Sequence, residues 1–201
     1  MIRVLIAEDQ AMVRGALASL LSLEPDIEIA AEVERGDRVV QAAVEAEPDV
    51  ALLDIEMPGL DGLSACAQLT RALPRARVLI LTTFGRPGYL RRAFENGASG
   101  FLLKDAPASR LAEAIRTVAG GGRAVDPALA AAAITEGESP LTGREHEVLA
   151  AAAGHDTAGD IAAALHLSEG TVRNYLSAAI RKLGARNRRE AIDAAVEKGW
   201  L

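Results

Sequence analysis

The sequence predicts an α/β domain built on a parallel sheet, followed by a smaller domain made only of helices. Residues 1–123 alternate short apolar runs of strand length with segments whose apolar residues recur at helical spacing. Residues 141–201 contain four segments of helical pattern. Alternating strands and helices predict a parallel sheet covered on both faces, with its ligand at the carboxyl ends of the strands.

Composition places the chain among ordinary globular proteins. Of its 201 residues, 50% are hydrophobic and 25% are charged, which excludes collagen-like, coiled-coil and disordered chains. No apolar run approaches the ~18 residues of a membrane span, and the N-terminus MIRVLIAED is too acidic for a secretory signal. Cys66 is the single cysteine, so an internal disulfide is excluded. We therefore expect a cytoplasmic protein without membrane insertion.

Strands of the first domain are expected where apolar runs are short, and its helices end where proline or glycine interrupts the pattern. Pro25, Pro48 and Pro74 each follow a helical segment, and the glycines at 120–122 close the last one. Five strands alternating with five helices are expected. The strands are 2–7, 27–33, 50–53, 78–81 and 101–103, and the helices include 11–23, 37–46, 63–73 and 107–119.

A linker and four further helices are expected after the first domain. Asp126 is a candidate cap for an alanine-rich helical stretch in the linker, which the segment 137–140 interrupts. Thr142 and Glu145 have the spacing of a capping box, which predicts the start of the next helix. The expected helices are 142–153, 158–165, 168–183 and 187–196, and the expected limits are 1–120 for the first domain, 121–139 for the linker and 140–201 for the second domain.

Residues that suit phosphoryl transfer follow four of the predicted strands. Carboxylates that converge at one edge of a sheet repel one another unless a cation offsets their charge, and Mg²⁺ prefers oxygen ligands of this kind. Asp54 is then the expected nucleophile, while Mg²⁺ and Lys104 neutralise charge on the phosphoryl oxygens. The residues are Glu8 and Asp9 after the first strand, Asp54 after the third, Thr82 and Thr83 at the fourth, and Lys104 after the last.

Each of these residues taken alone has a plainer explanation. Asp9 could cap the following helix, Asp54 could cap the turn at 57–59, and Lys104 could be a solvated surface lysine. Their joint position at four strand ends favours the functional interpretation.

The segments IAEDQ, LLDIEMPGLDG, LILTT and GFLLKD resemble the receiver domain of bacterial response regulators. The spacing is the specific part, with 28 residues from Asp54 to Thr82 and 22 from Thr82 to Lys104. The resemblance covers about the first 120 residues. It implies a flavodoxin-like fold of five strands and five helices, and phosphorylation of Asp54 by a partner sensor histidine kinase.

The same resemblance implies roles for individual residues of the first domain. Thr82 and Phe101 occupy the family's switch positions, so the Thr82 hydroxyl would turn toward the new phosphate and Phe101 would follow it inward. The implied Mg²⁺ ligands are Asp9, Asp54 and the backbone carbonyl of Glu56, with Glu8 in support, and the implied phosphate-binding and switch set is Thr82, Thr83, Phe101 and Lys104.

Basic residues are concentrated in the second domain although the whole chain has a net charge of −6. Residues 171–189 contain six bases and no acid. The helices expected at 158–165 and 168–183, joined by a tight turn, have helix-turn-helix geometry, in which the second helix enters the major groove of DNA. Outward side chains there suit bases or phosphates. The expected contacts are Arg173, Asn174 and Ser177 to bases, and Thr171, Arg181, Lys182 and Arg188 to phosphates.

A solvated basic helix is the plainer explanation, but the sequence of this region is more specific. LTGREHEVL and DIAAALHLSEGTVRNYLSAAIRKLGARNRREAI resemble the LuxR-type DNA-binding domain. Three positions depart from that pattern: Ala158 stands where asparagine is frequent, Asp160 where glutamate is usual and Tyr175 where histidine is commonest. We expect Ala158 to remove a local cap or a phosphate contact while the fold is kept.

A receiver followed by a LuxR-type domain is the arrangement of the NarL/FixJ class. This resemblance implies a transcription factor, not an enzyme, that dimerises on phosphorylation and binds promoter DNA, with RNA polymerase as a further expected partner. Within this class, the sequence looks closest to the regulator of a fatty-acid desaturase gene, in the segments IAEDQAMVRGAL, DIEMPGLDGL, LTTFGRPGYLRRAF, TVRNYLS and EKGW. The dimer face is left open between the first and fifth receiver helices and the region of the fourth.

Two alternative functions stay open on the sequence. The segment 54–56, Asp-Ile-Glu, superficially resembles the nucleophile motif of aspartate-dependent phosphohydrolases, which would make the protein an enzyme. A DNA-binding protein with a vestigial receiver would act without phosphorylation, but the acidic pair, Thr82 and Lys104 argue against it.

Overall fold

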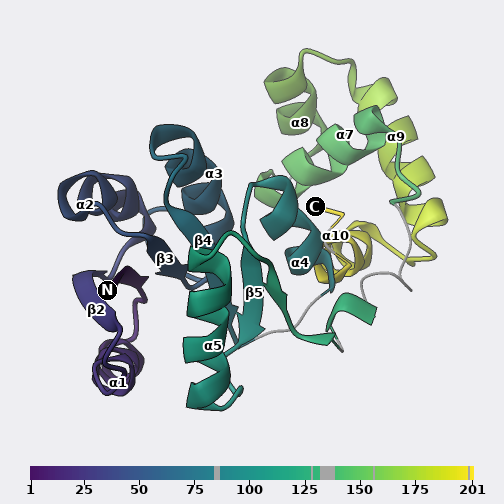
Figure 1. Ribbon diagram of the computed structural model, residues 1–201. Helices are drawn as coiled ribbons and strands as arrows, with labels where there is room; N and C mark the ends of the chain where they lie inside the picture. Colours follow the sequence, from purple (N-terminus) through teal and green to yellow (C-terminus); the bar gives the residue numbers. More distant parts are fainter. Residues whose placement is uncertain (84–86, 128, 132–138, 156, 199) are drawn as a thin grey trace. The chain divides into compact units, whose positions relative to one another are not determined.

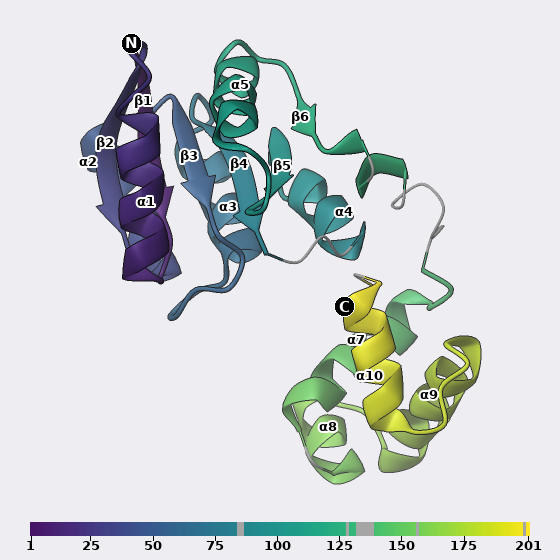
Figure 2. The same ribbon diagram turned by 90° about the horizontal axis from the view of Figure 1, so that it is seen from below.

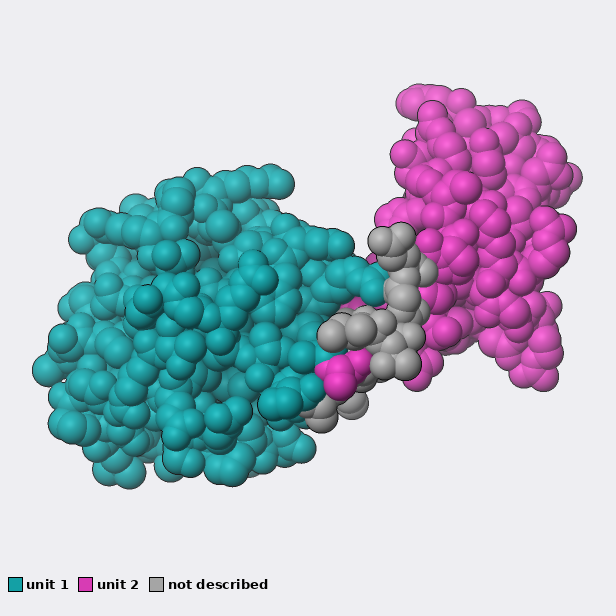
Figure 3. All heavy atoms as spheres, turned by 45° about the vertical axis from the view of Figure 1, so that its right-hand side comes forward, with its two compact units in different colours: residues 1–85, 90–130 teal, residues 86–89, 131–201 magenta. Residues whose placement is uncertain are grey.

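The computed structural model describes residues 1–83, 87–127, 129–131, 139–155, 157–198 and 200–201. These residues form two compact units, one made of residues 1–85 and 90–130 and the other of 86–89 and 131–201 (Figure 3). Within the described residues, no helix is both long and apolar enough to cross a membrane.

The first unit contains a parallel sheet of six strands in the order β2-β1-β3-β4-β5-β6. Helices α1 and α5 lie on one face of this sheet, and α2 and α3 lie on the other (Figures 1 and 2). The strands are Ile2–Ala7 (β1), Ile27–Val33 (β2), Val50–Leu53 (β3), Arg77–Thr82 (β4), Gly100–Leu103 (β5) and Ala124–Val125 (β6). The helices are Ala11–Leu21 (α1), Gly36–Arg38 (η1, a 3₁₀ turn), Val39–Ala46 (α2), Gly62–Ala72 (α3), Pro87–Glu95 (α4) and Ala108–Ala119 (α5).

The predicted α/β architecture is confirmed, and its apolar runs are explained by burial on both faces. Every residue of β3 is buried, and the core between the sheet and α1 and α5 includes Val4, Leu52, Leu79 and Ile115. The first three predicted strands agree with the observed bounds, and β4 and β5 begin one residue earlier than expected. The helix expected from residue 37 begins with the 3₁₀ turn, and α1 ends at Leu21 rather than at residue 23.

The sixth strand was not predicted, because two residues carry no recognisable strand pattern. Ala124 and Val125 pair with Gly100 and Phe101 of β5, in the stretch that we expected to be linker. Gly100 permits this pairing, since a Cβ there would lie 2.8 Å from the Ala124 carbonyl oxygen. The chain therefore returns from α5 to the edge of the sheet. Pro127 and residues 129–131 are helical, whereas the rest of the expected linker helix, 132–138, lies outside the described residues.

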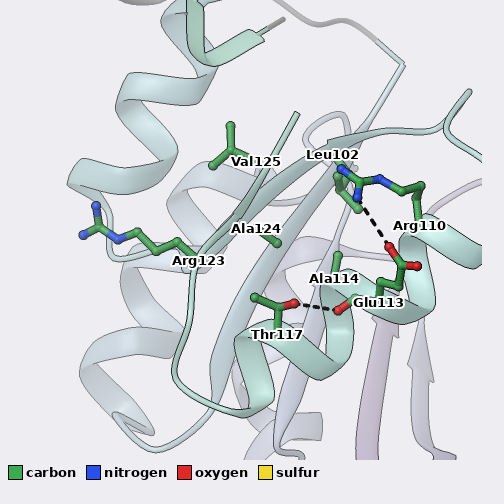
Figure 4. Close-up of a pocket in the computed structure, with 8 residues that line it drawn as sticks. All are labelled: Leu102, Arg110, Glu113, Ala114, Thr117, Arg123, Ala124 and Val125. Atoms are coloured by element: carbon green, nitrogen blue, oxygen red, sulfur yellow. Dashed lines mark hydrogen bonds and ion pairs between the residues drawn. The ribbon is translucent and has the colours of Figure 1, made fainter. Parts of the chain in front are cut away.

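A hollow of about 170 Å³ remains between α5 and β6 (Figure 4). Two arginines stand at its rim. Arg110 pairs with Glu113 at 3.4 Å, and the Arg123 guanidinium lies 5.2 Å from the centre of the Phe94 ring. The strand is thus attached to β5 by backbone pairing, Arg123 just before it contacts Phe94 of α4, and the space between the strand and α5 is incompletely filled. The lining residues are Leu102, Arg110, Glu113, Ala114, Thr117, Arg123, Ala124 and Val125.

The described residues from 139 onward form the four helices that were predicted: Gly143–Gly154 (α7), Ala158–Leu165 (α8), Glu169–Lys182 (α9) and Arg188–Glu197 (α10). Each begins with a side-chain cap. Thr142 and Thr157 head full capping boxes, and Ser168 and Asn187 accept a bond from the backbone three residues on. Val148, Ile161 and Val172 come from three of these helices and form one apolar cluster.

Arg116 of α5 links that helix to the loop before β2, and this link gives a testable pH dependence. Its guanidinium lies 2.6 Å from both Glu24 Oε2 and Asp26 Oδ1. Hydrogen bonding from Arg116 lowers the pKa of Asp26 to about 2. An aspartate in an unfolded chain has a pKa of ~3.9, so the stability from this pair is present above that pH and is lost as the pH falls toward 2.

We therefore expect an Arg116→Gln protein to be less stable than wild type at pH 5 and to approach it as the pH falls from 4 to about 2. Urea unfolding of the first unit, measured on both proteins at each pH, gives this difference directly. A difference that stays constant over the whole range would contradict the pairing.

Candidate functional site

Three carboxylates meet at the carboxyl edge of the sheet. Glu8 and Asp9 follow β1, and Asp54 follows β3, where the register pairs Ala7 with Leu53. One carboxylate oxygen from each of the three lies within 4.8 Å of the others. Glu8 and Asp54 are buried, with exposed fractions of 1% and 5%, whereas Asp9 is exposed. The structure thus brings together the acidic residues that the strand ends predicted, with one of them open to solvent.

Lys104 pairs with both buried carboxylates and offsets part of their charge. It follows β5, and its Nζ lies 2.6 Å from Glu8 Oε2 and 3.0 Å from Asp54 Oδ2. Burial, together with the nearby Asp54 charge, raises the pKa of Glu8 despite the bond from Lys104. Burial would lower the pKa of Lys104, but its hydrogen bonds to Glu8 and Asp54 raise it overall. The lysine therefore stays charged, and its charge stabilises the two buried carboxylates beside it.

The backbone around Asp54 is held closely. Its N–H donates to the Ala7 carbonyl at 2.9 Å, and its Oδ1 accepts from the Ile55 N–H at 2.8 Å. Gly62, at the start of α3, approaches so closely that a Cβ there would lie 1.8 Å from the Asp54 carbonyl oxygen. With Oδ1 bound to the backbone, Oδ2 faces Lys104.

The remaining residues expected in the first domain divide by exposure. Thr82 is buried at the end of β4, next to the strand that leads to Lys104, and the Lys104 N–H donates to the Thr82 carbonyl at 2.8 Å. Thr83 and Glu56 are exposed. Phe101 is fully buried in this structure.

The donor set fits a hard divalent cation. Three carboxylates within 4.8 Å of one another supply the oxygen ligands that Mg²⁺ prefers, and the exposed Asp9 leaves one side open to water and to phosphate oxygens. Bound Mg²⁺ would also relieve the repulsion between Glu8 and Asp54 that raises the Glu8 pKa.

The second unit presents the expected helix-turn-helix. His166, in a left-handed conformation with φ 54°, makes the turn between α8 and α9. Val172 is fully buried, whereas Arg173, Asn174 and Ser177 are exposed on α9. Thr171 is half-buried and Arg181 is exposed. The residues expected to contact bases therefore lie on the outer side of the second helix.

Three basic residues of this unit that we expected to contact DNA have partners within the protein. Lys182 Nζ lies 2.7 Å from Oε2 of the buried Glu145, and Arg188 donates to the His155 carbonyl at 3.1 Å. Arg173 pairs with Glu169 at 2.6 Å. The bond from Lys182, followed by that from the Thr142 backbone, lowers the pKa of Glu145. Helical spacing explains the Arg173 pair, but 37 residues separate Glu145 from Lys182, so no local pattern could have shown it.

The departures from the LuxR-type pattern are accommodated locally. The Thr157 side chain caps α8 by accepting a hydrogen bond from the Asp160 N–H. The Asp160 carboxylate in turn accepts from the Thr157 N–H at 3.3 Å. The helix beginning at Ala158 therefore keeps its cap, and aspartate performs the role of the usual glutamate.

Comparison with known proteins decides the family. Residues 4–116 match the response regulator receiver domain, and residues 139–195 match the bacterial regulatory proteins of the luxR family. The chain is a two-component response regulator of the NarL/FixJ type. Members of this family are DNA-binding transcriptional regulators rather than enzymes, and they interact with histidine kinases.

Full-length relatives support the same assignment. The chain is 48% identical to the uncharacterized transcriptional regulatory protein YvfU of Bacillus subtilis and 46% identical to the transcriptional regulatory protein DesR of the same organism, each over 100% of both chains. The identity to YvfU is slightly higher than that to DesR, so these matches do not single out DesR and do not confirm the expected likeness to a desaturase regulator. A solved structure, the response regulator ChrA of a heme-sensing two-component system, is 35% identical with a TM-score of 0.59, covering 100% of this chain and 98% of its own.

Proposed function

We propose that this response regulator is switched by phosphorylation of Asp54 and then binds promoter DNA as a dimer. The observation that carries the proposal is the group formed by Asp54, Glu8, Asp9 and Lys104 at one edge of the sheet. A cognate sensor histidine kinase is the proposed phosphoryl donor. We propose Asp9, Asp54 and the Glu56 carbonyl as Mg²⁺ ligands, with Glu8 in support, and Mg²⁺ would supply charge neutralisation during transfer.

The residues around Asp54 suit acceptance of a phosphoryl group. Oδ1 is bound to the Ile55 N–H, which leaves Oδ2 as the attacking oxygen, 3.0 Å from Lys104 Nζ. The new bond joins Oδ2 to phosphorus, and the bond to the donor atom breaks with its electron pair going to the donor. Lys104 then turns from the carboxylates to a phosphoryl oxygen, and the Thr82 and Thr83 hydroxyls complete the phosphate contacts.

The proposed switch is a shift between two populations. Moving a protein from 1:99 to 99:1 requires the phosphate to favour the active state by ~5.5 kcal/mol. Charge-assisted contacts of the phosphate with Lys104, Thr82 and the metal are the source that we propose for this preference. Phe101 is buried beside β6, so any change in it would be felt by the first residues after α5.

The exposed face of α1 is the part of the receiver that best suits a second copy of the chain. Met12 is 85% exposed, Leu20 44% and Leu23, just past the helix, 78%. Ala16 is also exposed and lies between Met12 and Leu20 at a spacing of four residues, so these side chains share one side of the helix. Of the two options left open by the sequence, we therefore propose dimerisation through the first helix, beside α5, rather than through the fourth-helix region.

For DNA, we propose that α9 reads bases in the major groove. Arg173 and Asn174 suit guanine and adenine, and Arg181 is exposed for phosphate. Lys182 and Arg188 would contact phosphates only with donors not used by Glu145 and His155. The full proposed set is Thr171, Arg173, Asn174, Ser177, Arg181, Lys182 and Arg188.

We propose that the domain limits are 1–120, 121–139 and 140–201, with β6 as a part of the linker anchored to the receiver. Control of lipid desaturation genes is the proposed target class, which rests on the likeness to DesR. Recruitment of RNA polymerase at the promoter is the proposed means of transcriptional control.

The test is the molecular mass in solution with and without Mg²⁺ and beryllofluoride, a mimic of the phosphoryl group. We expect wild type to change from monomer to dimer, and Asp54→Ala to remain a monomer under all conditions. Dimer formation by Asp54→Ala with beryllofluoride would overturn Asp54 as the acceptor. Asp54→Ala protein that binds promoter DNA as tightly as activated wild type would instead support a vestigial receiver.

A further inference from the structure

Arg14 turns into the protein from a helix with no other charged residue. Helix α1 has the sequence AMVRGALASLL, and the Arg14 side chain is only 18% exposed. Its Nη1 donates to the backbone carbonyl of Glu8 at 2.6 Å. That carbonyl belongs to the peptide unit between Glu8 and Asp9, whose carboxylates both lie in the acidic cluster.

The same guanidinium faces two acids at the end of the neighbouring strand. Arg14 Nε lies 3.8 Å from Glu32 Oε2, and Nη2 lies 3.9 Å from Glu34 Oε2. The arginine therefore joins three segments: α1, the loop after β1 and the end of β2. A fork of five donors can make such contacts simultaneously, which a lysine cannot do.

We infer that Arg14 is a positioning residue for the metal-binding loop, an inference that rests on the proposed function. By binding the Glu8 carbonyl, Arg14 fixes the orientation of the peptide group between Glu8 and Asp9. The orientation of this peptide group sets the directions of the Glu8 and Asp9 side chains. The Glu8 carboxylate is further fixed by the Gln10 N–H, which donates to Oε1 at 3.2 Å. Metal ligands require such outer contacts, since Mg²⁺ tolerates little departure from octahedral geometry.

Glu32 and Glu34 explain how the positively charged Arg14 can lie beside a site for Mg²⁺. An uncompensated arginine beside a Mg²⁺ site would repel the ion, whereas the carboxylates of Glu32 and Glu34, near its Nε and Nη2, offset its charge. The Glu8 carbonyl then accepts a hydrogen bond from Arg14, while the two carboxylates weaken the electrostatic repulsion between Arg14 and a cation at the acidic cluster. This arrangement separates the positioning role of Arg14 from any role as a ligand or as a phosphate contact.

A plain structural arginine is the alternative, and the chain supplies a matched control for it. Arg3 lies at the opposite end of β1 and makes the same kinds of contact. Its Nη1 lies 3.2 Å from Glu28 Oε1 of β2, and its Nη2 donates to the Ala46 carbonyl at 2.9 Å. Loss of Arg3 removes comparable bonds far from the acidic cluster.

The experiment compares full-length wild type with Arg14→Gln, Arg14→Lys and Arg3→Gln. Calorimetric titration with MgCl₂ measures the affinity, and hydrogen exchange of the Gln10 amide without Mg²⁺ measures the order of the loop. We expect Arg14→Gln to weaken Mg²⁺ binding by about 10–100-fold, the usual effect of losing an outer contact, and to speed Gln10 exchange. Arg14→Lys should recover part of both, and Arg3→Gln should leave both unchanged.

Wild-type affinity and wild-type Gln10 exchange in Arg14→Gln would overturn the inference while leaving the metal site intact. An equal loss of affinity in Arg3→Gln would also overturn it, since the effect would then be general destabilisation. If Arg14→Gln does not fold, Arg14→Lys decides the matter by the same two measurements. Absence of Mg²⁺ binding by wild type would overturn the proposed metal site itself and this inference with it.

Discussion

Replacement of Lys104 by methionine is expected to destabilise the receiver by about 3–5 kcal/mol at neutral pH. The lysine Nζ lies within 3.0 Å of carboxylate oxygens of Glu8 and Asp54, and both acids are buried. Methionine keeps the length of the side chain but leaves two neighbouring carboxylates without their cation. Urea unfolding of the receiver measures the change, and Arg71→Met, which removes an exposed cation on α3, is the control.

Two conditions should restore much of this loss. The pKa of Glu8 is already raised by burial and by the Asp54 charge, and removal of Lys104 raises it further. An acid whose pKa is higher in the folded state stabilises that state as the pH falls through the raised value, so the deficit should shrink toward pH 5. Millimolar Mg²⁺ should act in the same direction at pH 7. A deficit that grows on acidification, or wild-type stability at pH 7, would contradict the proposed charge balance.

Replacement of Gly62 by alanine is expected to destabilise the receiver by about 3 kcal/mol and to abolish its response to beryllofluoride. A Cβ at this position would lie 1.8 Å from the Asp54 carbonyl oxygen and 2.8 Å from its carbonyl carbon. Both neighbours are backbone atoms, so no side chain can turn away to make room. Either α3 or the segment that carries Asp54 must move, and the second movement displaces the acceptor from Lys104.

Gly15→Ala is the matched control for this substitution. Gly15 lies inside α1, and a Cβ there would meet nothing within 4 Å. Because glycine is unfavourable inside a helix, the change should stabilise the receiver by about 0.5–1 kcal/mol. Thermal unfolding is measured on both variants, and beryllofluoride-dependent dimerisation is measured on Gly62→Ala and wild type, because Gly15 lies on the helix proposed as the dimer face. Wild-type stability and response in Gly62→Ala would show that the close approach of α3 is not required.

Much of the fold was predictable because its signals are local. Buried parallel strands appear as short apolar runs, and Pro25, Pro48 and Pro74 separate helices from strands. The strand ends also placed Glu8, Asp9, Asp54 and Lys104 at one edge, since parallel strands share the direction of their carboxyl ends. For these features the order of residues along the chain is sufficient information.

The contacts that complete the site needed the tertiary structure. Strand β6 has two residues and no pattern, and only its pairing with Gly100 and Phe101 reveals it. The bond between Lys182 and Glu145 spans 37 residues, and side-chain hydrogen bonds over such separations leave no periodic trace. Arg14 is the one charged residue of α1, and its bond to the Glu8 carbonyl is set by the direction in which its side chain turns, which no local pattern states.

The sequence by itself therefore determined the class of the protein and the order of its elements, and it predicted the acidic residues that meet at the sheet edge, because each depends on residue type and spacing along the chain. Tertiary structure alone decided which glycine lets α3 approach Asp54 and which arginine holds the Glu8 carbonyl. These depend on distances between segments, which are set when the helices pack on the sheet and not by any local preference of the chain.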